Sequence, residues 1–266
     1  PMLREALRTR EQVMGATSLE VAASLMSLAE VVQFDEGVDL NRRALAIRRP
    51  ALGPGHFDTA LSEFRLGDKL FCKNESEEAK PHLERALVVF RRHPGKGDKP
   101  ASWWLATLGN MLWFQGKRSE SLIYHRESLR IKEAALGPED PDLSIGLNNL
   151  GYGLTLLGRY SEAKPLLERS VSLSEKALGA NHPGLSTYLQ SYGELLGRMG
   201  ETAAARDALE RALRLGEPVR GPDNGQIILT RQSLAALYVD LGDHATARTH
   251  FRRAVEGMER STEVLD

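Results

Sequence analysis

Apolar residues recur at spacings of three and four along most of the chain, most clearly between residues 143 and 179. The stretch "LSIGLNNLGYGLTLLG" carries one row of leucines, at Leu143, Leu147, Leu150, Leu154 and Leu157. Such a row is the apolar stripe of an amphipathic helix. A second row runs through "RYSEAKPLLERSVSLSEKAL", after which Gly179 and Pro183 signal a helix end. The segment predicts two consecutive helices, and no stretch alternates with period two long enough to predict strands.

This pattern returns every 42 residues. The loop "ALGPEDPDLS" at 135–144 reappears as "ALGANHPGLS" at 177–186. Three columns of residues keep the interval: Gly53, Gly95, Gly137, Gly179 and Gly221; Gly67, Gly109, Gly151, Gly193 and Ala235; and Ala79, Ser121, Ala163, Ala205 and Ala247. A sixth, shorter copy precedes them. Because periods of this size indicate arrays of stacked supersecondary units, the sequence predicts an all-α solenoid.

Spacing inside the unit distinguishes the possible repeat types. Armadillo and HEAT units run about 40–47 residues, whereas the standard tetratricopeptide unit has about 34. The order Leu150-Gly151, Ala163, Leu167, Ser170 follows the tetratricopeptide pattern of small residues, which lie where neighbouring helices approach most closely. We expect the eight extra residues to lengthen the second helix and the loop after it.

The segment "ALGPEDPDLSIGLNNLGYGLTLLGRYSEAKPLLERSVSL" resembles the 42-residue tetratricopeptide repeat of the kinesin light chain type. The resemblance extends over nearly the whole chain and is strongest from about 104 to 216. It implies a right-handed α-solenoid of about six hairpins with a leading single helix and a concave groove. Such repeats are also common in large bacterial signalling proteins, so we expect the sequence to be a fragment of a multidomain protein of that kind.

The repeat grid predicts seven segments. They are the second helix of an incomplete preceding repeat (1–15), a short first repeat (16–53), and repeats at 54–95, 96–137, 138–179, 180–221 and 222–266. Since each unit needs the same chain reversal, the recurring loops are structural. Function is therefore expected where the copies differ.

Family geometry places the groove on the first helix of each unit. The residues that it implies as a peptide-binding groove are Phe64, Asp68, Phe71, Trp103, Asn110, Trp113, Phe114, Asn148, Tyr152, Gln190, Glu194 and Arg198. Aromatic walls with interspersed amides suit an extended peptide. In the family, the Asn pair of the LNNL motif holds the ligand backbone, a role that the resemblance implies for Asn148. The alternative for the tryptophans is packing between units, and Trp104 is expected in the core.

Composition narrows the function classes. With 35 basic and 36 acidic residues, the chain gives no electrostatic reason to expect nucleic acid or a membrane as partner. A single cysteine, Cys72, excludes a disulfide framework or a thiolate zinc site within the chain. The seven histidines show no metal-binding spacing. The stretch "HPGKGDKP" from His93 lacks the phosphate-loop pattern and is interpreted as a turn between repeats.

The sequence thus predicts a cytoplasmic, non-catalytic module with no cofactor and no metal. Its expected work is to bind a peptide segment of a partner protein in the concave groove. The alternative is a structural or autoregulatory scaffold that self-associates or packs on another domain of its parent protein.

Overall fold

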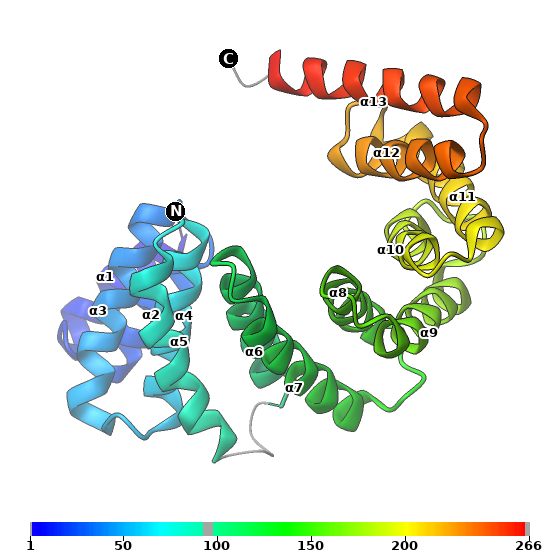
Figure 1. Cartoon of the computed structure of the whole chain (residues 1–266). Coiled ribbons are helices and arrows are strands. Elements are labelled where there is room, and N and C mark those ends of the chain that lie inside the picture. Colours follow the sequence, from blue (N-terminus) through cyan, green and yellow to red (C-terminus); the bar gives the residue numbers. More distant parts are fainter. Residues whose placement is uncertain (1, 93–97, 264–266) are drawn as a thin grey trace. The chain divides into compact units, whose positions relative to one another are not determined.

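The computed structural model describes residues 2–92 and 98–263, and within these ranges every regular element is an α-helix. The all-α prediction is therefore confirmed. The helices are α1 (Met2–Met14), α2 (Leu19–Ala29), α3 (Phe34–Leu52), α4 (Phe57–Cys72), α5 (Ser76–Arg91), α6 (Asp98–Phe114), α7 (Arg118–Leu136), α8 (Leu143–Leu156), α9 (Tyr160–Leu178), α10 (Leu185–Arg198), α11 (Thr202–Arg220), α12 (Gly225–Asp240) and α13 (His244–Glu263) (Figure 1).

The chain forms two compact units, Pro1–Ala135 and Leu136–Asp266. In the first unit α2 pairs with α3 and α4 with α5, while α3 and α5 also contact the hairpin that follows each of them. In the second unit α8 pairs with α9, α10 with α11 and α12 with α13, and the second helix of a hairpin again contacts the first helix of the next. Each unit is therefore a stack of antiparallel helix pairs, as the repeat predicts.

The glycine column lies at the centre of the hairpins. A Cβ added to Gly151 would lie 2.7 Å from the Cγ of Leu167, and one added to Gly193 would lie 2.7 Å from that of Leu209. In the hairpin of α6 and α7, His125 takes the leucine's place over Gly109, and the Ser121 hydroxyl donates to the Gly109 carbonyl oxygen at 2.6 Å. Small residues recur at 42-residue intervals because the paired helices leave no room for a side chain there.

A second glycine column ends the long helices. Gly53, Gly179 and Gly221 follow the last residues of α3, α9 and α11 with φ of 83°, 88° and 81°. This left-handed backbone is accessible to glycine without steric cost, which makes it a common helix terminator. Gly95 of the same column and most of the "HPGKGDKP" stretch lie outside the described residues.

Trp104 lies in the core between two hairpins of the first unit, as expected. It is 3 % exposed, and its ring centroid is 4.3 Å from that of Phe64 and 3.5 Å from that of Phe90. Phe64 belongs to α4, Phe90 to α5 and Trp104 to α6. One aromatic side chain from a first helix therefore contacts both helices of the preceding hairpin.

Ion pairs connect neighbouring hairpins on their second helices. Arg42 pairs with Glu78 at 2.8 Å and Arg91 with Glu127 at 2.6 Å in the first unit, and Arg211 pairs with Glu175 at 2.5 Å in the second. The acidic partner of each arginine thus comes from the adjacent repeat. Exposed pairs of this kind contribute little individually, on the order of 0–1 kcal/mol.

Candidate functional site

Aromatic side chains remain exposed on the first helices of the first unit. Trp103 is 50 % and Phe114 is 80 % exposed, although both belong to large apolar residue types. Phe71 of α4 and Phe114 of α6 lie with ring centroids 6.4 Å apart. The Arg118 guanidinium lies 5.3 Å from the ring centroid of half-buried Trp113. This aromatic face, defined by Phe71, Trp103, Trp113 and Phe114, joins two neighbouring hairpins.

Phe64 does not belong to that surface. The structure buries its side chain completely, with the ring 5.2 Å from Trp103 and 4.3 Å from Trp104. The groove position of one repeat is here covered by the first helix of the next. Phe64, which the resemblance assigns to the groove, is instead part of the packing between hairpins.

The two polar groove candidates of the first unit differ in environment. Asn110 is exposed on α6. Asp68 on α4 is half-buried, and burial raises the pKa of its carboxyl group, with Arg65 and Lys69 opposing that effect. Both residues are polar neighbours of the aromatic face on the same two helices.

In the second unit, two amides of the predicted groove are almost enclosed. Asn148 on α8 is 7 % exposed and Gln190 on α10 is 6 % exposed. The Gln190 Nε2 donates to Glu194 Oε2 at 3.3 Å, whereas Asn148 Oδ1 has no hydrogen-bond partner. A buried acceptor without a partner carries a desolvation cost of about 1–3 kcal/mol.

Glu194 organises the other polar groups of this row. Its Oε1 accepts two hydrogen bonds from the Arg198 guanidinium, at 3.0 and 3.3 Å. Burial, and to a lesser degree the neighbouring Glu194, raises the pKa of the Tyr152 hydroxyl. Tyr152 of α8 therefore lies within electrostatic reach of Glu194 and Arg198 of α10.

A hollow of about 270 Å³ lies beside Arg198, between α10 and α12. Its lining includes Gly193, Glu194, Gly197, Arg198, Leu209, Ser233, Ala236, Leu237 and Asp240. Most of these side chains are small or apolar, and the charged groups are Glu194, Arg198 and Asp240. The arrangement offers an apolar recess with ionic groups beside it.

Sequence reasoning named Glu194 and Arg198 of this hollow as groove residues but did not name Gly197. Gly197 and Ala236 leave room for the recess because glycine has no side chain and alanine has only a methyl group. Other repeats carry larger residues at the equivalent positions. The only signal in the sequence is that these positions are small and outside the conserved spacing of the repeat grid. Such a signal does not distinguish a recess from an ordinary exposed glycine or alanine.

Another ionisable cluster surrounds Glu63 of α4. No group of three or more His, Cys, Asp or Glu side chains in this part of the chain is arranged to hold a metal ion. The buried carboxylate of Glu63 receives His82 Nδ1 at 2.5 Å, Arg85 at 3.2 Å and Arg49 at 3.0 Å. Burial raises its pKa, but the hydrogen bonds from His82 and Arg85 outweigh that effect and lower it overall.

A tetratricopeptide repeat family profile matches residues 99–173, 142–217 and 192–260, which together span more than half of the chain. The chain belongs to the tetratricopeptide repeat family. Repeats of this family are typical of protein–protein interaction modules and of scaffolds without catalytic activity. A search of the curated proteins finds no matching sequence.

Solved structures with the same fold include proteins of the kinesin light chain type. BtubC (BKLC) from P. vanneervenii has a TM-score of 0.67 and 16 % identity, over 87 % of this chain and 93 % of that one. A putative kinesin light chain from Podospora anserina with nearly identical tetratricopeptide-like repeats has a TM-score of 0.62 and 17 % identity, over 79 % and 98 %. These similarities confirm the tetratricopeptide solenoid fold.

YrrB, described as a tetratricopeptide protein with an unusual peptide-binding site, has a TM-score of 0.54 and 18 % identity over 81 % of this chain and 93 % of its own. At this identity the similarity establishes the common fold.

Among the described residues, no helix is both long enough and apolar enough to cross a membrane.

Proposed function

We propose that this tetratricopeptide array binds an extended peptide segment of a partner protein, with the hollow between α10 and α12 as its central contact. The observation that carries the proposal is the hollow itself, an apolar recess of about 270 Å³ bordered by Arg198 and Asp240. It is smaller than the roughly 300–1,000 Å³ of sites that enclose a drug-sized ligand or cofactor. Its size therefore suits a single side chain of a peptide, and the chain is proposed to work without catalysis or cofactor.

Polar groups of the second unit suit a peptide backbone. The amide of Asn148 on α8, outside the lining of the hollow, is proposed as a backbone contact because the family resemblance implies that role for it. The Arg198 guanidinium keeps donors beyond the two that Glu194 Oε1 accepts, and it is available to a peptide carbonyl. These groups would fix the direction of the peptide, while the hollow selects one of its side chains.

The aromatic face of the first unit is proposed as a second contact surface. Trp103 and Phe114 expose large apolar area on α6, the helix that also carries the exposed Asn110. Aromatic side chains provide contact area at low entropic cost and are enriched among the residues that dominate binding energy. Phe64 is left out of the proposed surface because it is buried. The repeat boundaries given above remain part of the proposal, as does a cytoplasmic location.

A scaffold role is the second candidate, and one specific feature favours it. Met2, Leu3, Leu28, Val31 and Val32 line a mostly apolar hollow of about 530 Å³ at α1 and α2. Met2 is 83 % and Val31 67 % exposed. Light scattering of the chain over a range of concentrations tests this candidate: a dimer that dissociates on Val31→Glu supports it, and a monomer at all concentrations contradicts it.

A peptide-display selection on the 266-residue chain tests the proposed peptide binding. Gly197→Leu with Ala236→Leu fills the hollow, and the exposed Ala204→Leu on α11 is the matched control of equal chemistry. Circular dichroism checks that the helix content of all variants is unchanged. We expect a motif that is enriched by the wild type and the control and lost in the filled variant. Absence of an enriched motif, or one equally enriched by the filled variant, would contradict the proposal.

A further inference from the structure

The last helix of the second unit carries an exposed apolar row. Phe251, Val255 and Met258 follow one another at spacings of four and three on α13, and they are 44 %, 46 % and 37 % exposed. Within the described residues of the second unit, α13 contacts α12, whose Gln232 donates to the Met258 sulfur at 3.8 Å, and no later helix packs on the row. We call it the α13 face. Singly exposed apolar residues are ordinary, but a row at helical spacing forms a continuous strip that another helix can cover.

Earlier repeats show what covers the same positions. Val171 lies 84 residues before Val255, and it packs with Leu185 and Leu189 of the following first helix, α10. Phe90 lies 168 residues before Met258, and it packs on Trp104 of the following first helix, α6. The α13 face therefore has the shape and register of a surface that, elsewhere in this chain, receives an amphipathic helix.

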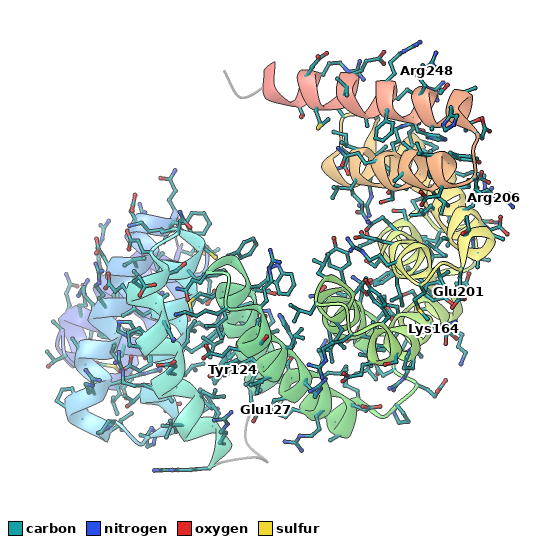
Figure 2. All side chains as sticks on the ribbon, viewed as in Figure 1. Tyr124, Glu127, Lys164, Glu201, Arg206 and Arg248 are labelled. Carbon is teal, nitrogen blue, oxygen red and sulfur yellow. The ribbon has the colours of Figure 1, made fainter. Side chains whose placement is uncertain are left out.

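The charges beside the face indicate what such a helix would carry. Lys164, which lies 84 residues before Arg248, pairs with Glu201 of the following hairpin at 2.7 Å, and Figure 2 labels all three residues. Arg206, at the same position of the intervening repeat, pairs instead with its neighbour Asp207 at 3.0 Å. Arg248 is exposed and has no ion-pair partner among the described residues.

A second arginine reverses the charge found in the earlier repeats. At the position of Arg252 the two preceding repeats carry Glu168 and Glu210, which accept hydrogen bonds from Tyr192 and Tyr238 of the following first helices. An arginine accepts no hydrogen bond, so a helix over the α13 face would meet it with an acceptor, best a carboxylate. Arg252 is likewise exposed and without an ion-pair partner in the described part of the chain.

We propose that the α13 face binds an amphipathic helix of a partner protein, with apolar residues at spacings of three and four over Phe251, Val255 and Met258 and with carboxylates opposite Arg248 and Arg252. The surface lies on α13 and is separate from the hollow between α10 and α12. It would give the protein a second binding site that recognises a folded helix rather than an extended peptide.

The test uses a stapled peptide derived from the chain itself. A synthetic fluorescent peptide of residues 181–203 contains Leu185, Leu189 and Glu201, and Tyr192→Glu supplies the carboxylate opposite Arg252. A hydrocarbon staple joins positions 193 and 197, which face α11 in the intact chain, so the short helix stays formed. The control peptide carries lysine at 192 and 201 instead. Fluorescence anisotropy with the 266-residue chain measures both affinities.

The acidic peptide is expected to bind the wild type at least tenfold more tightly than the lysine peptide, and Arg248→Glu with Arg252→Glu should reverse that preference. Phe251→Glu should abolish binding of both peptides, while Ala204→Leu, away from the face, should change neither. No binding of the acidic peptide at 1 mM, or binding indifferent to the charge reversal, would overturn the proposal. So would a dimer of the chain in light scattering that Phe251→Glu dissociates, because a second copy would then cover the face.

Discussion

Leu209 packs so closely on Gly193 that a Cβ added to the glycine would lie 2.7 Å from the leucine Cγ. Gly193→Ala should therefore force the hairpin of α10 and α11 apart and lower the free energy of unfolding by about 1–3 kcal/mol. Urea unfolding followed by circular dichroism measures this as a lower midpoint.

The same helix provides the matched control. A Cβ at Gly197, one turn further along α10, would meet only the Ala205 Cβ, at an ordinary 3.9 Å. Gly197→Ala should raise stability by roughly 0.5–1 kcal/mol, since alanine loses less backbone entropy in a helix. If both variants shifted the midpoint in the same direction, the close packing at Gly193 would not be the cause.

Trp103 and Trp104 are adjacent in sequence but should respond differently to truncation. Trp104 is 3 % exposed between Phe64 and Phe90, so Trp104→Ala should cost about 3–5 kcal/mol. Trp103 is half exposed, so Trp103→Ala should cost about 1 kcal/mol and act mainly on partner binding. Comparing the urea midpoints of the two variants checks the difference; equal losses would place both side chains in the core.

His125 predicts a pH dependence of stability. Burial lowers its pKa to about 4, from 6.5 for an exposed imidazole. Since the folded state disfavours the charged ring, stability should be fully present above pH 6.5 and decline as the pH falls toward 4. A shift of this size corresponds to roughly 3 kcal/mol once the folded-state pKa has been passed.

His125→Leu should remove that decline. Leu83, Leu167 and Leu209 hold the equivalent positions over their glycines, so a leucine fits the site. The free energies of unfolding of variant and wild type should diverge between pH 6.5 and 4, with the variant more stable at the acid end. Parallel curves would show that His125 is not the titrating group.

Glu63 predicts a second acid-sensitive contribution. Its pKa is lowered overall, so its stabilising effect should be present above the pKa of an unfolded glutamate and lost as the pH falls through the folded-state value. Glu63→Gln leaves the cations of Arg49 and Arg85 without their carboxylate and should cost about 3 kcal/mol at pH 7. Because the variant lacks the carboxylate, the difference from wild type should shrink on acidification.

The repeat grid predicted the hairpins because packing and chain reversal are local and periodic. Gly151 must be small for Leu167, and Gly179 must adopt a positive φ, whatever the array binds. The sequence also placed Trp104 in the core. It assigned Phe64 to the groove because family geometry describes one helix, whereas the burial of Phe64 comes from the first helix of the next repeat.

Contacts between repeats were the part that spacing along one helix could not reveal. Glu78 and Glu127 reach Arg42 and Arg91 from the next hairpin, 36 residues away, while Asp39 also pairs with Arg42 from the same helix. The hollow was not predicted for a similar reason. It needs small residues on two different helices, Gly197 and Ala236, and the spacing along one helix does not show that these two positions meet.

The most direct measurement of the central claim is the affinity of a display-selected peptide for the hollow. Isothermal titration calorimetry should compare the wild type, Gly197→Leu with Ala236→Leu, and Ala204→Leu. We predict that filling the hollow weakens binding by at least tenfold, about 1.4 kcal/mol, while the control binds as the wild type does. Equal affinities of all three proteins would show that the peptide binds elsewhere and would contradict the account.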